Sequence, residues 1–128
     1  MLTEPDSEEA QMTVHSFLKR RFSLHTVDVA LAESLNAIWK HTNIHGDLNS
    51  RDAEAAVRDL IRIHSKLEVL ATSELAEETT TIAQGQNITI YDGLYIAATR
   101  KLNATLLTSD QKLYGTASSL TNTELLKH

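Results

Sequence analysis

The sequence contains no cysteine, which excludes a disulfide framework, a zinc site built on thiolates and a cysteine nucleophile. Its single proline and four glycines are few helix breakers, and they predict long helices joined by short loops. Aromatic residues make up only 5% of the chain, so the core must consist mainly of Leu, Ile, Val and Ala. With 128 residues the chain fits one domain, which we expect to span residues 1–128.

Further absences restrict the location and the chemistry of the protein. No apolar run approaches the ~18 residues of a membrane span, and the N-terminal segment is acidic and polar, unlike a signal peptide. We therefore expect a cytoplasmic protein without membrane contact. The formal net charge is −5, so a global positive field for nucleic acid is absent, and the local basic groups are also explained as solvated helix faces. Without a P-loop, G-x-G-x-x-G or G-x-S-x-G motif, the common nucleotide-binding and serine-hydrolase sites are excluded.

Hydrophobic periodicity predicts helices that alternate with short strands. The predicted helices cover residues 7–21, 27–45, 50–64, 73–84 and 92–102, with one further turn at 110–114, and the predicted strands cover 22–25, 67–70 and 104–108. We expect Ser50 to cap its helix, and Gly46 and Gly85 to end theirs. Each connection between strands is long enough for a helix, which favours an α/β fold with a parallel sheet covered on both faces.

Asp92 and Asp110 are expected to lie close together. A helix over residues 92–102 rises ~15 Å, and a strand over 104–108 returns by ~16 Å. Both acids then lie at the carboxyl edge of the sheet, where α/β proteins bind ligands. Two neighbouring carboxylates repel each other unless a cation or a proton intervenes, and a hard divalent ion would satisfy both. Spacing alone leaves a second interpretation open, in which each aspartate only caps a helix.

Other polar candidates are less distinctive. Glu33 lies opposite an apolar stripe formed by Val27, Leu31, Leu35 and Ile38, a position typical of a surface glutamate. His41 and His45 are one helical turn apart and would suit two ligands of a zinc ion. No third ligand is evident, and histidine is also common at helix ends, so both interpretations stay open.

Three motifs follow one another along the chain. Residues 28–40 contain Glu33-Ser-Leu-Asn36, an E-x-x-N pattern in a predicted helix. Residues 87–98 contain Tyr91-Asp92-Gly-Leu-Tyr95-Ile-Ala-Ala, and residues 104–113 contain Leu-Leu-Thr108-Ser-Asp110-Gln-Lys-Leu. In this order they resemble the E-x-x-N helix, the Y-D-x-x-Y-x-A-x-A helix and the L-x-T-x-D-x-x-L strand end of the PIN-domain ribonucleases of the VapC toxin type. The similarity covers nearly the whole chain.

The resemblance implies a three-layer α/β/α domain with a central parallel sheet. It also implies a magnesium- or manganese-dependent endoribonuclease that is the toxin of a type II toxin-antitoxin pair. Glu33, Asp92 and Asp110 match the catalytic, metal-binding acids of the family, and Asn36 and Thr108 match supporting residues. The implied partners are an RNA substrate, a small antitoxin protein and a second copy of the chain.

The chain departs from the family at its N-terminus. The family begins with a central strand that ends in an aspartate, typically the first metal ligand, whereas residues 2–10 resemble the segment after that strand. We therefore expect a fold that lacks the first strand, and Glu4, Asp6 and Glu8 belong to a segment that the family places farther on. A shortened reading frame, a substitute element or partner chain, and a degenerate domain each explain the difference. The alternative function is thus a non-catalytic PIN-like module that binds an antitoxin or RNA.

Overall fold

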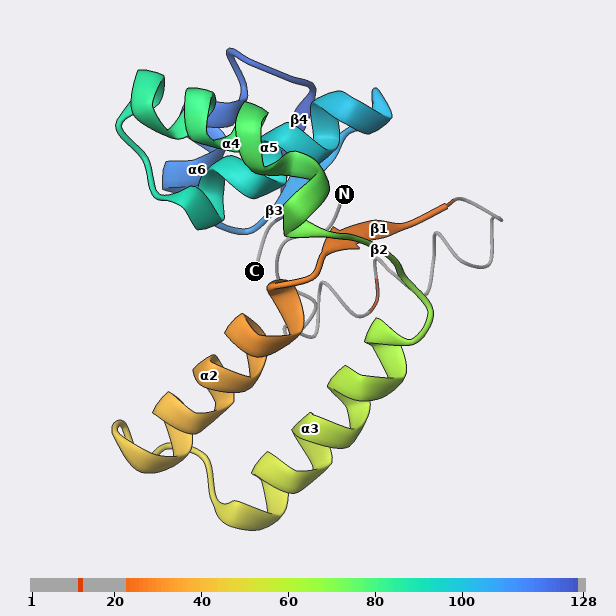
Figure 1. Cartoon of the computed structure of the whole chain (residues 1–128). Helices are drawn as coiled ribbons and strands as arrows, with labels where there is room; N and C mark the ends of the chain where they lie inside the picture. Colours follow the sequence, from red (N-terminus) through yellow and green to blue (C-terminus); the bar gives the residue numbers. More distant parts are fainter. Residues whose placement is uncertain (1–11, 13–22, 127–128) are drawn as a thin grey trace.

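The computed structural model describes Met12 and residues 23–126, and Figure 1 shows their arrangement. Helices and strands alternate through most of the chain. Their order is β1 (His25–Val27), α2 (Ala30–Asn43), α3 (Ser50–His64), β2 (Glu68–Leu70), α4 (Thr72–Gln86), α5 (Ile90–Leu102), β3 (Leu106–Thr108), α6 (Gln111–Ala117) and β4 (Thr123–Leu125). The helix predicted over residues 7–21 lies outside the described residues, apart from Met12.

The strands pair in parallel, as the sequence predicted. β1 pairs with β2, with His25 opposite Glu68, and β3 pairs with β4, with Leu106 opposite Thr123. Within residues 23–126 these pairs form two separate two-stranded sheets. The sequence did not predict β4, because its Thr-Glu-Leu segment is short and only half-buried and shows no alternation long enough to mark a strand.

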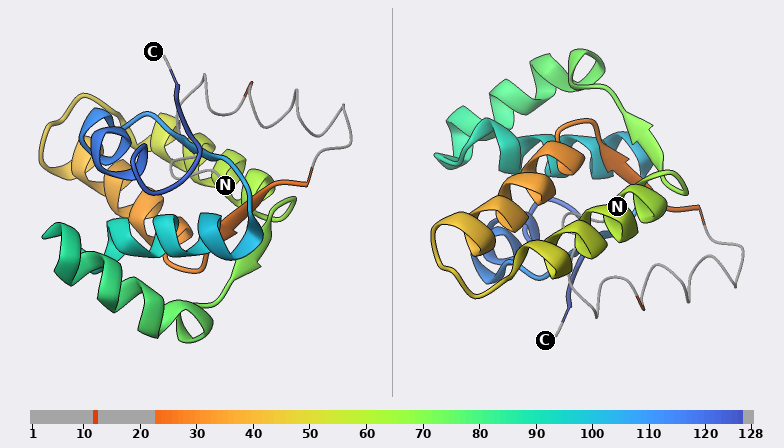
Figure 2. Two further views of the ribbon diagram at one scale, coloured as in Figure 1. Left: turned by 90° about the horizontal axis from the view of Figure 1, so that it is seen from above. Right: turned by 90° about the horizontal axis from the view of Figure 1, so that it is seen from below.

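The helices form two groups around the strands. α2 and α3 lie side by side as an antiparallel hairpin that projects from the body of the molecule in Figure 1, and the view from below in Figure 2 shows the same pair. α4 and α5 pack against each other on the other side of β1 and β2. Because the connection from α5 turns directly back into β3, the first turn of α5 and the end of β3 meet at one edge of the fold.

The centre of the core is α5, in which every residue from Gly93 to Thr99 is buried. Leu94 and Ile96 are 1% and 0% exposed, and they pack in the same cluster as Leu106 of β3 and Val27 of β1. A side chain of this kind contributes about 1.5–3 kcal/mol when it is fully buried. The helix that carries Asp92 is therefore held rigidly against both strand pairs.

The boundaries of β1 and α2 differ from the prediction. The strand expected over residues 22–25 covers His25–Val27, and the helix expected from Val27 begins at Ala30. Val27 is fully buried and belongs to β1. The prediction placed it in a helix because it fits the spacing of a helical apolar stripe. The predicted apolar stripe is also not the buried face of α2. Ala30 and Ser34 are the buried residues of this helix, whereas Leu35 is 36% exposed.

The helix ends also correct several expectations. Asn49, rather than Ser50, caps α3, because its side-chain oxygen accepts the N–H of Asp52 at 2.8 Å. α4 continues through Gly85 and ends at Asn87, which adopts a left-handed conformation with φ 53°. Asparagine adopts this conformation more readily than most residues, so it replaces glycine as the stop signal. The helix predicted over 50–64 has the bounds that the structure shows.

Candidate active site

Five residues that the sequence singled out line one cavity of about 430 Å³. They are Glu33 and Asn36 of α2, Asp92 of α5, Thr108 at the end of β3, and Asp110 before α6. The expected meeting of Asp92 and Asp110 is thus observed at the carboxyl end of β3. The structure also brings Glu33 to the same cavity, although its helical position alone suggested an unremarkable surface residue. The catalytic and metal-binding roles of these residues remain predictions.

The position of Asp92 is determined by the start of α5. Thr89 caps the helix, and its hydroxyl oxygen accepts the N–H of Asp92 at 3.2 Å. The Gly93 N–H donates to the Thr89 carbonyl at 3.0 Å, which begins the helical ladder. Asp92 therefore lies in the first turn, where the helix dipole favours a negative charge.

Asp110 caps a helix and also lines the cavity, so the cap does not exclude the second role that the sequence left open. Its Oδ1 accepts the N–H groups of Lys112 at 2.9 Å and Leu113 at 3.1 Å, so it caps α6. Its own N–H donates to the Thr108 hydroxyl at 3.1 Å, which ties the cap to the end of β3. Capping uses Oδ1, and the same carboxyl group still lines the cavity. The cap fixes the carboxylate beside Asp92 rather than removing it from the site.

Glu33 is held in the cavity by Tyr95, whose hydroxyl donates to Glu33 Oε1 at 2.7 Å. The Tyr95 side chain is only 4% exposed, so this bond extends from the core to the cavity wall. Sequence analysis included Tyr95 in a motif but gave it no role. The available signal was its position three residues after Asp92, which places both side chains on one face of α5.

The electrostatics of the cavity are those of crowded carboxylates. Partial burial raises the pKa of Asp92 above its ordinary value, and the negative charge of Asp110 raises it further, while Lys112 opposes the change. The folded protein therefore resists a negative charge on Asp92 unless a proton or a cation compensates it. The acidic donors are all carboxylate oxygens, the ligand type that Mg²⁺ and Mn²⁺ prefer.

The acids are not arranged as a complete metal cage. Among the described residues, no group of three or more His, Cys, Asp or Glu side chains lies close enough together to hold a metal ion. The mutual repulsion of Asp92 and Asp110 fits a hard cation, whereas the Glu33 carboxylate is tied to Tyr95. A site with one or two carboxylates suits Mg²⁺, which usually retains several bound waters. Asp92 and Asp110 thus fit the ion, with Glu33 at the edge of their site.

The histidine pair does not form a zinc site. The rings of His41 and His45 have centroids 5.4 Å apart, but His41 Nδ1 bonds to the Asp47 carboxylate at 3.0 Å. The Asp47 contact leaves His41 Nε2 open. Among the described residues, however, no group of three or more His, Cys, Asp or Glu side chains includes this pair and could hold a metal ion.

The fold and the cavity define the class of protein to which the chain belongs. The PIN domain model matches residues 2–118, so the chain belongs to the PIN-domain family. A curated relative is the ribonuclease VapC3 of Pyrobaculum aerophilum, which is 31% identical over 110 residues, or 86% of this chain and 80% of the relative. A crystal structure of PAE2754 from the same organism superposes with a TM-score of 0.72 at 24% identity, covering 95% of this chain and 87% of that one.

These comparisons confirm the predicted family and the α/β class of the fold. None of the helices within residues 23–126 combines the length and the apolar character that crossing a bilayer requires.

Proposed function

We propose that the chain is a metal-dependent endoribonuclease, the toxin component of a toxin-antitoxin pair. The observation that carries this proposal is the crowding of Asp92 and Asp110 in one cavity, where burial and mutual repulsion raise the pKa of Asp92. Membership of the PIN-domain family and similarity to a VapC ribonuclease support it.

Each residue of the cavity would have a different role in phosphodiester hydrolysis. Asp92 and Asp110 would hold a Mg²⁺ or Mn²⁺ ion, and Glu33, kept at the cavity wall by Tyr95, would accept a hydrogen bond from the attacking water. When bound, the ion lowers the pKa of a water and neutralises negative charge on the phosphate. Thr108 fixes the backbone of Asp110, and Asn36 offers an amide to the substrate.

Two protein partners belong to this proposal: a small antitoxin that covers the cavity, and a second copy of the chain. The outer surface of α2 suits a protein contact, because Trp39 is 50% exposed and Leu35, one turn before it, is 36% exposed. Burial of these two side chains against a partner would remove apolar surface from water, which favours association.

RNA cleavage by the full chain tests the nuclease. The wild type, Asp92→Asn and Asp110→Asn are incubated with structured RNA in Mg²⁺, Mn²⁺ or EDTA. We expect cleavage that requires the ion and falls by at least about a hundredfold in either variant. Glu54→Gln is the matched control, because Glu54 is an exposed acid on α3 that does not line the cavity, and its activity should equal that of the wild type. Metal-independent cleavage, or full activity in Asp92→Asn, contradicts the proposal.

The second candidate is a non-catalytic PIN-like module that binds an antitoxin or RNA. The observation in its favour is that the described acids do not group as three metal ligands. Isothermal titration calorimetry with Mn²⁺ separates the two functions. The module predicts no heat of metal binding in a folded protein that still binds RNA, whereas the nuclease predicts binding that Asp92→Asn weakens.

A further inference from the structure

The acid cavity is lined by a lysine and a histidine as well as by its carboxylates. Lys40 and His41 line it together with Glu33, Asn36 and Ala37, and all five belong to α2. Glu33, Ala37 and His41 are spaced by four residues, so one face of the helix carries an acid near its start and a histidine, next to Lys40, near its end. The helix rises about 12 Å between positions 33 and 41. α2 therefore offers two chemically different contacts along the same cavity.

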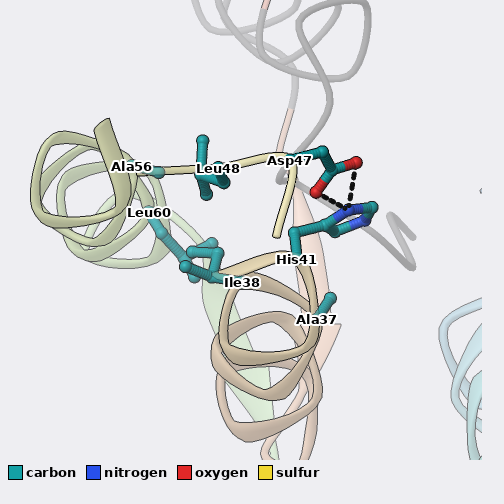
Figure 3. Close-up of a pocket in the computed structure, with 7 residues that line it drawn as sticks. All are labelled: Ala37, Ile38, His41, Asp47, Leu48, Ala56 and Leu60. Carbon is teal, nitrogen blue, oxygen red and sulfur yellow. Dashed lines mark hydrogen bonds and ion pairs between the residues drawn. The ribbon is translucent and has the colours of Figure 1, made fainter. Parts of the chain in front are cut away.

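The His41 side chain is held by Asp47, as Figure 3 shows. Both carboxylate oxygens of Asp47 lie within hydrogen-bond distance of His41 Nδ1, at 3.0 and 3.1 Å. A carboxylate only accepts hydrogen bonds, so Nδ1 carries the ring proton in this pair. Nε2 is then the ring nitrogen available to a ligand.

The backbone around this pair also fixes its geometry. The N–H groups of Asp47 and Leu48 donate to the His41 carbonyl, at 3.1 and 3.3 Å. Gly46 adopts a φ of 68°, a left-handed conformation that lets the chain turn back onto the end of α2. Exposed ion pairs alone are weak. Here the turn holds the carboxylate beside the imidazole in addition to the direct contact, which favours one orientation of the ring although both side chains are exposed.

His41 stands at the boundary between the acid cavity and a second cavity of about 320 Å³. The two cavities share Ala37 and His41, and the second is lined mainly by apolar residues of α2, α3 and the connecting loop, which are Ala37, Ile38, Leu48, Ala56 and Leu60 (Figure 3). The ring is thus at the edge of the acid site rather than at its centre. This position suits contact with a part of the substrate beside the reacting bond.

We infer that Lys40 and His41 bind the RNA backbone phosphate that neighbours the scissile one, an inference that rests on the proposed nuclease function. The chain has a net charge of −5, and its acid cavity repels a polyanion, so local cations are needed to bring RNA to the site. Lys40 supplies a positively charged side chain. In the imidazolium form His41 donates from both ring nitrogens, so that Nδ1–H is bound by Asp47 and Nε2–H is directed to a phosphate oxygen.

A binding experiment tests this inference separately from catalysis. The full chain is titrated into a short fluorescein-labelled single-stranded RNA in EDTA, and fluorescence anisotropy is followed over a series of salt concentrations. Lys40→Gln and His41→Gln should each weaken binding about threefold to tenfold and lower the slope of log K against log salt by about 0.7, the value for one phosphate contact on a single strand. Lys101→Gln is the charge-matched control, because Lys101 is exposed near the end of α5 and does not line the cavity.

Two further measurements distinguish the orientation of the His41 ring from effects on protein folding and on the rate of the chemical step. Asp47→Asn leaves the imidazole in place but weakens its orientation, so its loss of affinity should be smaller than that of His41→Gln. In the cleavage assay, His41→Gln should raise KM with kcat within about twofold of the wild type, because a remote phosphate contact binds substrate and transition state alike. Lys40 is exposed, so Lys40→Gln should fold normally. It can therefore test the inference even if thermal melting shows that another variant is unstable.

The outcomes distinguish the two proposals. Unchanged affinity and salt slope in Lys40→Gln and His41→Gln overturn the inference, even if cleavage still depends on Asp92. No RNA binding by the wild type also overturns it. RNA binding that depends on Lys40 and His41 in a protein that does not cleave supports the phosphate contact and rejects the nuclease.

Discussion

Gly93 is where the structure makes its sharpest stability prediction. This residue follows Asp92 and lies in the close contact between α5 and α4. A Cβ atom at position 93 would lie 3.1 Å from the Thr79 carbonyl oxygen, 3.3 Å from Thr79 Cγ2 and 3.5 Å from Ala83 Cβ. The nearest of these atoms is backbone, which cannot rotate away, so Gly93→Ala must separate the two helices by a few tenths of an ångström.

The magnitude follows from two opposing effects. Alanine is favoured over glycine inside a helix by about 1 kcal/mol. Overpacking a tight contact costs about 1–3 kcal/mol, and here the backbone of a second helix must move. The two ranges leave a net cost of about 0–2 kcal/mol, so we expect Gly93→Ala to lower the free energy of unfolding by up to about 2 kcal/mol and the Tm by up to roughly 8 °C. RNA cleavage should also fall, because the displacement occurs one residue from Asp92.

Chemical denaturation and thermal melting measure this change, and two other glycines provide the control. Gly85 in α4 and Gly115 in α6 have no atom within 4 Å of a built Cβ, apart from the local neighbours of each residue. Gly85→Ala and Gly115→Ala should therefore stabilise the protein, by up to about 1 kcal/mol. If Gly93→Ala is as stable as these controls, the α4–α5 contact is looser than the structure shows and the reasoning is refuted.

Three further predictions concern side chains around the strands and the cavity. Asp92→Asn should stabilise the fold by about 0.5 kcal/mol at neutral pH, because the raised pKa of Asp92 makes its ionisation costly in the folded state. Urea melts should show that this gain in stability grows as the pH rises above 3.8, the ordinary pKa of an aspartate. Asp28 accepts hydrogen bonds from the Thr72 hydroxyl and from the Thr72 N–H, the latter at 2.9 Å, and both bonds lower its pKa. Asp28→Ala should therefore lower the free energy of unfolding by about 1 kcal/mol. The difference in stability between wild type and variant should shrink as the pH falls through the lowered pKa. Tyr95→Phe should cost about 1 kcal/mol of stability and lower the rate of RNA cleavage, because Glu33 loses the hydroxyl that holds it at the cavity wall. An unchanged kcat would show that Tyr95 does not position this acid.

Local signals predicted much of the framework. The bounds of α3 were obtained from helical periodicity together with a capping residue expected at its start, and β2 and β3 were each placed within two residues of their observed starts. Parallel pairing followed from the length of the connections. Asp92 and Asp110 met as expected, because rise per residue determines where the end of a helix–strand unit returns. These successes depend on properties that one element carries by itself.

The sequence-based predictions were wrong or incomplete where contacts between distant elements determine the structure. The large apolar residues of α2 predicted its buried face, but the helix buries Ala30 and Ser34 and leaves Leu35 partly exposed. No residue of α2 indicates by itself that Tyr95, 62 positions away, reaches Glu33 from the core. The pairing of His41 with Asp47 also escaped detection, because it depends on a turn at Gly46 that periodicity does not describe.

Asp110 shows that an aspartate can cap a helix and also line a cavity, so the two roles do not exclude each other. Sequence reasoning treated the helix cap and the site acid as competitors for one residue. In the structure the cap uses Oδ1, with N–H donors from Lys112 and Leu113, and the carboxyl group is thereby immobilised beside Asp92. A carboxylate held by backbone donors does not rotate away from a like charge, so Asp110 continues to raise the pKa of Asp92. Under the proposed function, the hydrogen bonds that begin α6 would therefore also preorganise one acid of the site at the end of a parallel strand.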